Sequence, residues 1–201
     1  FPRDLDQISY ALHFRDLINY RTDPDLFIAI DIPNAVIDER IKYRVVCPVC
    51  HTPRNLKLLA TKDVGYDKEN KTFYLKCDDP NCSNPGARMV GKEGDNLGME
   101  PIRERIERDG MLIDKMFTLH GIPKILLRNA IPAVSAARYV DGYEITPAYN
   151  YDYDEKTETV KTIDSPWTVK DDEGVEVHSL LAPAVVTALL KQLPKALNIK
   201  V

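Results

Sequence analysis

The segments that decide the fold of this chain are "CPVC" at residues 47–50 and "CDDPNC" at residues 77–82. Each places two cysteines a few residues apart, and Pro48 and Pro80 stiffen the turns between them. The 26 residues between the two pairs contain a predicted hairpin, which would bring both turns to one end of a small sheet. A tetrahedral zinc ion takes four thiolates most simply from two such turns. The sequence therefore predicts a single zinc site with the ligands Cys47, Cys50, Cys77 and Cys82.

Predicted strands complete this arrangement. "IKYRVVC" (41–47) reads as a strand that leads into the first turn, and residues 56–62 and 71–76 read as two strands joined by a polar turn. A strand, a cysteine turn, a hairpin and a second cysteine turn, in this order, resemble the zinc-ribbon family. The second turn, "CDDPNCSNPGARM", also resembles that of the four-cysteine zinc module of NAD-dependent DNA ligases. No Lys-x-Asp-Gly adenylation motif is present, so ligase activity does not carry over.

A zinc site of this kind is expected to be structural. Four thiolates leave no open coordination position, so the ion can neither activate water nor polarise a substrate. Its binding energy is instead folding energy, on the order of 10 kcal/mol or more, for a hairpin too small to fold alone. The predicted zinc is therefore not a catalytic centre.

The first turn also fits a second metal group. Cys47-x-x-Cys50-His51 has the spacing of a c-type haem attachment motif, in which both cysteines become thioethers and the histidine is an axial ligand. This interpretation leaves Cys77 and Cys82 unused, requires export without a visible signal and expects helices where strands are predicted. The zinc interpretation is therefore preferred, with c-type haem as a remote alternative, and His51 is then only the residue that follows the turn.

The whole chain is predicted to be α+β, with the ribbon inserted in a small mixed domain of helices and antiparallel hairpins. Three segments are expected: an N-terminal helix and strand in 1–40, the zinc ribbon in 41–92, and an α+β body in 93–201. The elements expected outside the ribbon are a helix at 5–19, a strand at 25–33, helical stretches at 101–121 and 123–140, a tyrosine-faced hairpin at 143–163, a second hairpin at 165–179 and an apolar helix at 180–197.

Charge is distributed unevenly along the chain. Residues 40–92 contain eleven Lys or Arg against five Asp or Glu, although the net charge of the whole chain is −4. A basic ribbon favours contact with nucleic acid, with Tyr43, Phe73 or Tyr74 stacking on bases. The same charge would also stabilise the thiolates without any such ligand. The candidate phosphate contacts are Arg44, Arg54, Lys57, Lys76 and Arg88.

Composition limits the class of protein. The chain is 44% hydrophobic and 29% charged, and no apolar run reaches the roughly 18–20 residues that span a bilayer, so no membrane partner is expected. Acidic residues scattered through the first twenty residues do not fit a secretory signal, and a start at Phe1 favours a processed or trimmed chain. Four cysteines in two short motifs indicate metal-bound thiolates rather than disulfides, and therefore synthesis in the cytoplasm.

Motifs of catalysis are missing from the sequence. No phosphate-binding glycine loop, nucleophile elbow or His-Glu-x-x-His pattern occurs, and the four histidines are isolated, so the prediction leans away from an enzyme. We expect a non-enzymatic, zinc-stabilised structural or adaptor subunit that docks on other proteins in a larger assembly, for which a viral particle is a natural setting. The tyrosine-faced hairpin and the last helix are the expected contact surfaces, and the alternative for either is a place in the core. The alternative of a different class is a nucleic-acid-binding accessory factor in transcription, replication or repair.

Overall fold

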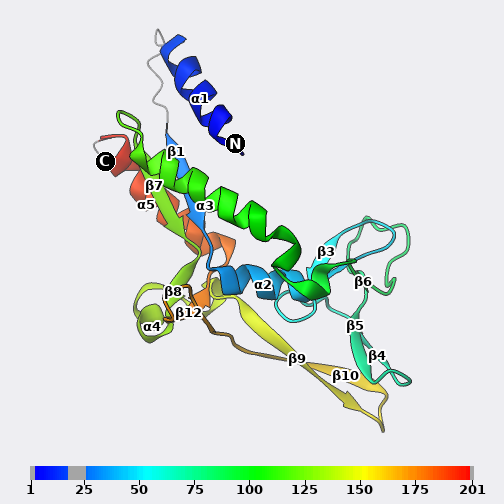
Figure 1. Cartoon of the computed structure of the whole chain (residues 1–201). Coiled ribbons are helices and arrows are strands. Elements are labelled where there is room, and N and C mark those ends of the chain that lie inside the picture. Colours follow the sequence, from blue (N-terminus) through cyan, green and yellow to red (C-terminus); the bar gives the residue numbers. More distant parts are fainter. Residues whose placement is uncertain (1–2, 18–25, 200–201) are drawn as a thin grey trace. The chain divides into compact units, whose positions relative to one another are not determined.

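The structure is a computed structural model that describes residues 3–17 and 26–199 of the 201-residue chain (Figure 1). Its fold is mixed α+β, in which helices are combined with several antiparallel strand pairs, and the predicted fold class is confirmed. The chain forms two compact units, each assembled from separate stretches. Unit 1 comprises Phe1–Ile32, Glu100–Asn129 and Ala182–Val201, and unit 2 comprises Pro33–Met99 and Ala130–Leu181.

Unit 1 combines helices with one small parallel sheet. Its elements are α1 (Leu5–Leu17), β1 (Phe27–Asp31), the 3-10 turn η2 (Glu100–Ile102), α3 (Arg103–Thr118), β7 (Lys124–Arg128) and α5 (Ala182–Ala196). Strands β1 and β7 pair in parallel, with Ala29 opposite Leu126, and α5 packs on β7. Ile8 of α1 and Leu112 and Met116 of α3 form a buried apolar cluster.

Unit 2 contains the cysteines and the long hairpin. Its first stretch has α2 (Asn34–Lys42), β2 (Arg44–Val46), β3 (Pro53–Asn55), β4 (Val64–Asp67), β5 (Thr72–Leu75), β6 (Val90–Gly91) and η1 (Asp95–Leu97). Its second stretch has β8 (Ala130–Pro132), η3 (Ala133–Ser135), α4 (Ala136–Tyr139), η4 (Gly142–Glu144), β9 (Pro147–Asp154), β10 (Thr159–Pro166), β11 (Val169–Lys170) and β12 (Glu176–Ser179).

The ribbon consists of short antiparallel pairings. Strand β2 lies between β3 and β6, and β4 pairs with β5 across the turn that follows Asp67. The Asp67 carboxylate accepts hydrogen bonds from the backbone of Glu69 and Asn70, which fixes this turn. Beyond β5, the Met89 amide donates to the Leu75 carbonyl and the Cys77 amide to that of Ala87, so the ladder continues to the second cysteine turn. The sheet therefore carries the cysteines at its ends.

One buried asparagine joins the ribbon to α2. The Asn55 amide nitrogen donates to the Arg40 carbonyl at the end of α2, 3.0 Å away. Its side-chain oxygen accepts from the backbone of Lys57 (2.9 Å) and Leu58 (2.8 Å). Because this one side chain satisfies a helix terminus and a turn together, it fixes where the ribbon leaves the helix.

The tyrosine-faced hairpin packs inside unit 2. Tyr149, Tyr151 and Tyr153 alternate along β9, as the sequence predicted. The Tyr153 ring stacks on Tyr66 of β4 with centroids 4.3 Å apart, and the Tyr151 ring lies 5.5 Å from that of Phe73 of β5. The Tyr151 hydroxyl also donates to the Leu56 carbonyl. These rings therefore hold the long hairpin on the ribbon.

Several predicted elements differ from the structure. The helical stretch at 123–140 is wrong over its first part, where β7 and β8 form, because a short apolar run can be a buried strand or a helix. The strand at 56–62 is also wrong, since Asn55 turns this segment and β4 starts only at Val64. Helix α2 was not predicted. The helix at 5–19 is confirmed over Leu5–Leu17, and its last two residues lie outside the described residues.

The remaining elements agree better with the sequence. The strand at 25–33 is confirmed over Phe27–Asp31 as β1, and its residue 25 is not described. The helix at 101–121 is confirmed over Arg103–Thr118 as α3. The helix at 180–197 is confirmed as α5. The segment boundaries 1–40, 41–92 and 93–201 stay a prediction, and the compact unit that holds the cysteines is wider than the ribbon segment.

Candidate metal centre

The first cysteine turn lies between β2 and β3. The His51 amide donates to the Cys47 carbonyl (3.0 Å), and the Cys47 amide donates to the Thr52 carbonyl (3.1 Å). His51 has a φ of 60°, a left-handed conformation that reverses the chain directly after Cys50. The Val49 amide also lies 3.4 Å from the Cys47 sulfur. This turn presents both of its sulfurs on the same side of the loop.

The second cysteine turn follows β5. The Asp79 carboxylate accepts from the Asn81 amide (2.8 Å), and the Asp79 carbonyl accepts from the Cys82 amide (3.1 Å). An aspartate that bonds to the backbone two residues further on forms a tight turn without help from a sheet. Both turns therefore present two cysteines, but backbone hydrogen bonds form the first and an aspartate side chain helps to form the second.

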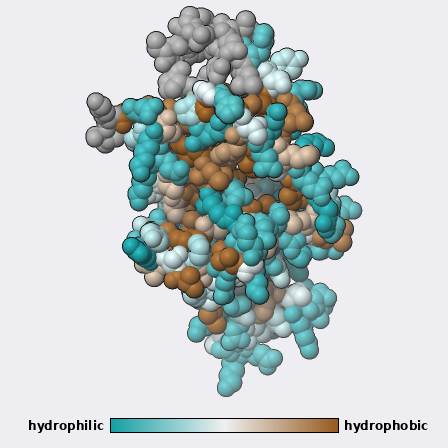
Figure 2. Space-filling view, turned by 60° about the vertical axis from the view of Figure 1, so that its left-hand side comes forward, coloured by the Kyte–Doolittle hydropathy of each residue, from teal (hydrophilic) through white to brown (hydrophobic). Residues whose placement is uncertain are grey.

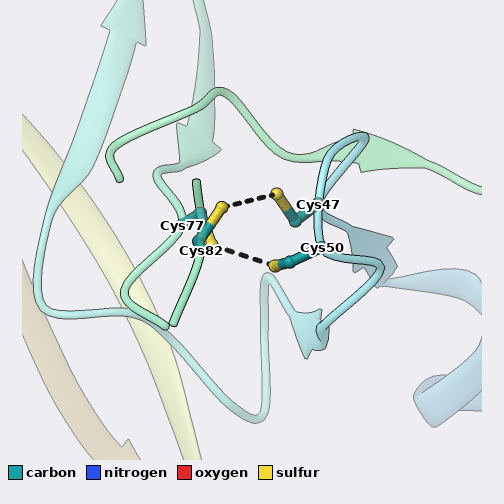
Figure 3. Close-up of side chains that lie close together, drawn as sticks. All are labelled: Cys47, Cys50, Cys77 and Cys82. Atoms are coloured by element: carbon teal, nitrogen blue, oxygen red, sulfur yellow. Dashed lines mark hydrogen bonds between the residues drawn. The ribbon is translucent and has the colours of Figure 1, made fainter. Parts of the chain in front are cut away.

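The four sulfurs converge on one point (Figure 3). Cys47 and Cys50 on one loop face Cys77 and Cys82 on the other, and all four sulfurs lie within 4.8 Å of one another. The Cys47–Cys82 sulfurs are 3.8 Å apart and the Cys50–Cys77 sulfurs 3.6 Å apart. A disulfide would need about 2.05 Å. A tetrahedron with metal–sulfur bonds of about 2.3 Å has edges of roughly 3.8 Å. The cluster could therefore hold one metal ion.

Two polar contacts that the sequence analysis missed connect the cysteine turns. The Thr52 hydroxyl donates to the Asp79 carboxylate (2.6 Å) and lies 3.2 Å from the Cys50 sulfur. The Arg54 guanidinium donates to the Asp78 carboxylate (2.7 Å). The two acidic residues directly after Cys77 were the only available signal in the sequence, and their partners lie 24 and 27 residues earlier. These contacts hold the two turns at a fixed spacing.

The thiols differ in acidity before any metal binds. Hydrogen bonding to the Thr52 side chain and backbone lowers the pKa of Cys50 to about 6. For Cys77, a backbone hydrogen bond from Asp79 lowers the pKa, but burial and the neighbouring cysteines outweigh it and raise the pKa to about 12. The pKa of Cys82 is also raised, because burial and its cysteine neighbours outweigh a backbone contact at Asn84. A coordinated cation would deprotonate all of these thiols.

Most of the cluster is buried. Three of its cysteines are buried and Cys50 is half-buried, and Leu75 and Met89 complete the same buried group. An ion held here would have sulfur ligands on all sides and apolar residues behind them, with no open position for a substrate. A metal ion held in this way would stabilise the fold.

The two arginines nearest the cysteines pair with acidic residues of their own chain. The Arg44 guanidinium forms a bidentate pair with the buried carboxylate of Asp95, at 2.6 and 2.7 Å. Arg54 pairs with Asp78, as described above. Binding a phosphate through either arginine would have to displace these carboxylates.

Two of the other three predicted phosphate contacts are also engaged. Lys57 pairs with Glu39. Arg88 pairs with Asp67 at 3.0 Å. Lys76 is different, since within residues 3–17 and 26–199 it has no ion-pair partner. The nucleic-acid contacts stay a prediction. Of the five candidate phosphate contacts, Lys76 is the one without an ion-pair partner among the described residues.

The aromatic residues predicted to stack on bases have neighbours within unit 2. The Lys57 amine lies 5.2 Å from the Tyr43 ring centroid, and the Arg88 guanidinium lies 4.3 Å from that of Tyr74. The Phe73 ring packs against Tyr151. No base could stack on the occupied faces without moving these side chains.

The fold and the cluster define a class: a mixed α+β protein with a four-cysteine site that could hold a metal ion. In the described part of the chain, these cysteines are the one group of at least three His, Cys, Asp or Glu residues that could do so. No described helix is long and apolar enough to cross a membrane. Comparison of the chain with models of known families, with curated proteins and with solved structures finds no match.

Proposed function

We propose that this chain is a non-enzymatic structural or adaptor subunit of a larger multi-protein assembly, such as a viral particle, and that one zinc ion stabilises it. The observation that carries the proposal is the closed cluster of four sulfurs, which are 3.6–3.8 Å apart across the two turns. Thiolates in this arrangement leave no position for a substrate. Reduced, metal-bound thiols also fit synthesis in the cytoplasm.

Zinc is favoured over haem by the size of the site. A haem would bind Cys47 and Cys50 covalently and need room for a macrocycle beside them, where Cys77 and Cys82 lie. Tetrahedral sites with four thiolates hold zinc or iron, and zinc has no redox chemistry that would damage its ligands. The exposed His51 is then a turn residue and not a ligand.

Exposed apolar residues of unit 1 support a role in docking. Val186 and Leu190 lie four residues apart on α5, hence on one face, with 52% and 61% of their surfaces exposed. Ile30 of β1 and Leu126 of β7 are also exposed. Figure 2 shows hydrophobic residues at the surface among hydrophilic ones. Parallel sheets are normally covered on both faces, so these side chains fit a surface that a partner buries.

The metal is tested on the purified full chain. Elemental analysis should find one zinc per chain, and the absorption spectrum should have neither a Soret band nor the visible bands of an iron–thiolate centre. A Soret band, or one iron per chain after production in the native host, would overturn the zinc assignment. A chain without any metal that keeps its ribbon structure would overturn the stabilising role.

The docking role is tested with tagged chains in the native host. Wild type should retain defined protein subunits in a fixed stoichiometry, and a Val186→Glu/Leu190→Glu variant should lose them with its zinc content unchanged. The matched control is Thr187→Glu/Lys191→Glu, which places the same side chains on exposed positions one residue further along α5. Equal loss in both variants, or no retained subunit in wild type, contradicts docking through this helix.

A further inference from the structure

Unit 2 contains an open cavity that the metal centre does not use. It has a volume of about 420 Å³ and lies between the β4–β5 hairpin and strand β10. Cavities of roughly 300–1,000 Å³ are the usual size for binding a small molecule or one unit of a polymer. Lys62, Lys68 and Lys76 line it together. Asp63 and Glu158 line it as well. The cavity is therefore large enough for a ligand, and its charged lining has three lysines against two acids.

The three lysines are not equally neutralised. Lys68 pairs with Glu158 at 2.5 Å, and both residues line the cavity. Lys62 and Lys76 have no ion-pair partner in the described part of the chain, and Lys76 is half-buried. Ammonium groups without a counter-charge in a concave site concentrate a positive field there. Such a field attracts an anionic ligand.

Aromatic rings form another part of the wall. The Tyr74 ring lies directly on Gly65, where an added Cβ atom would come within 2.2 Å of the ring, and Arg88 lies over Tyr74 with 4.3 Å to its centroid. Tyr66 and Tyr153, stacked with centroids 4.3 Å apart, line the same cavity. These contacts hold the rings in place before a ligand arrives, which reduces the entropy lost on binding.

We propose that this cavity binds single-stranded nucleic acid through one nucleotide unit, with Lys62 and Lys76 contacting its phosphate and the tyrosine rings flanking its sugar or base. A basic groove that contacts the backbone is one part of how proteins bind single strands without sequence preference. The tyrosines act here as walls of the cavity and not as stacking platforms, since Arg88 lies over Tyr74 and the other two rings stack on each other. A recessed site admits the exposed nucleotide of a single strand, whereas the bases of a duplex are stacked inside it. This binding function is additional to protein docking and does not depend on it.

The test measures binding of the zinc-loaded full chain to a fluorescent dodecathymidylate by anisotropy. A Lys62→Ala/Lys76→Ala variant should bind roughly tenfold more weakly than wild type at low salt, and its log–log salt slope should fall by about 0.7, since one neutralised phosphate on a single strand contributes about that much. The matched control Lys71→Ala/Lys92→Ala removes the same charge from exposed positions outside the cavity and should change affinity less than threefold.

Competitors identify the ligand. A duplex of equal length should displace the probe poorly, and unlabelled single-stranded RNA or DNA should displace it fully. Thymidine monophosphate, which carries the one unit that the cavity binds, should displace it only at higher concentrations than the strand, which offers several such units. Equal displacement by polyglutamate would make the cavity an acidic-peptide site and overturn the proposal. Displacement by the mononucleotide at the concentration of the strand, absence of wild-type binding, or equal weakening by both double variants would overturn it as well.

A second readout uses the unmodified chain, so that it does not depend on the folding of a variant. Bound dodecathymidylate should protect Lys62 and Lys76 from acetylation, measured by peptide mass spectrometry, and leave Lys71 and Lys92 as reactive as before. Uniform protection of all four lysines, or of none, contradicts a site in this cavity.

Discussion

The ribbon of unit 2 and the helical core of unit 1 are built by different means. Three of the five buried residues around the ribbon are cysteines, and the cluster of unit 1, Ile8, Leu112 and Met116, contains no thiol. Short strands of two to four residues cannot bury enough apolar surface to offset their conformational entropy. A 13-residue and a 16-residue helix can do so by packing together. On the proposed function, the ribbon therefore depends on a bound ion, where unit 1 depends on side-chain packing.

Loss of one thiolate should have the largest effect and should be confined to the ribbon. We expect Cys82→Ser to abolish stoichiometric zinc binding and to remove much of a stabilisation on the order of 10 kcal/mol. Elemental analysis and near-ultraviolet circular dichroism of the tyrosines measure the loss, and the far-ultraviolet helix signal should largely persist. His51→Ala, a change at an exposed neighbour of the cluster, should keep the zinc. If Cys82→Ser keeps both its zinc and its tyrosine signal, the ribbon does not depend on a metal held by this cysteine.

Removing a buried side chain from the core of unit 1 should destabilise that unit and leave zinc binding unchanged. Leu112→Ala removes a buried side chain and should lower the free energy of unfolding of this unit by roughly 2–5 kcal/mol. Denaturant unfolding followed by helix content measures it, and zinc content should not change. Met111→Ala alters the exposed neighbouring position and should cost less than about 0.5 kcal/mol. If Leu112→Ala releases zinc, the two regions are not independent.

Tyr151 tests how the long hairpin is held on the ribbon. Tyr151→Phe leaves the Leu56 carbonyl without its hydrogen bond and should cost about 1 kcal/mol. Burial, with a smaller contribution from the charge of Tyr149, raises the pKa of Tyr151 to about 12, above its ordinary value of about 10. The folded state therefore holds this proton more tightly, and the stabilisation is complete below about pH 10 and lost as the pH rises towards 12.

Alkaline denaturation of the full chain measures this effect. Stability of wild type should fall more steeply between pH 10 and 12 than that of Tyr151→Phe, which has no hydroxyl to ionise there. Tyr139→Phe, at an exposed position, should keep the wild-type profile. Identical profiles for wild type and Tyr151→Phe would show that the hairpin does not depend on this hydroxyl.

The smallest difference concerns ion pairs. Arg54→Met breaks a largely buried pair with Asp78 between the cysteine turns and should cost roughly 1 kcal/mol. Arg103→Met breaks an exposed pair with Glu100 in unit 1 and should cost less than about 0.5 kcal/mol. Thermal unfolding at low and high salt compares them. If both substitutions lower stability by the same amount, the ribbon and unit 1 do not differ in how much they depend on ion pairs.

The sequence already contained the local features of this protein. Two short cysteine motifs identified a four-sulfur cluster, and the alternation of tyrosines identified the hairpin of β9 and β10, because spacing along a turn or strand fixes which side chains share a face. It could not separate β7 from a helix, since the apolar run at 125–127 fits either until β1 pairs with it. Helix α2 was missed because no side chain caps its start.

By itself, then, the sequence determined the α+β class and the two cysteine turns, because both follow from periodicity and from the chemistry of neighbouring residues. Only the tertiary structure decided which charges are free. Arg44 and Arg54 are as basic as Lys76 in the sequence, yet folding places carboxylates from distant segments against the two arginines and leaves the lysine in an open cavity. Charge pairing depends on distances across the fold, and these do not appear in the order of residues.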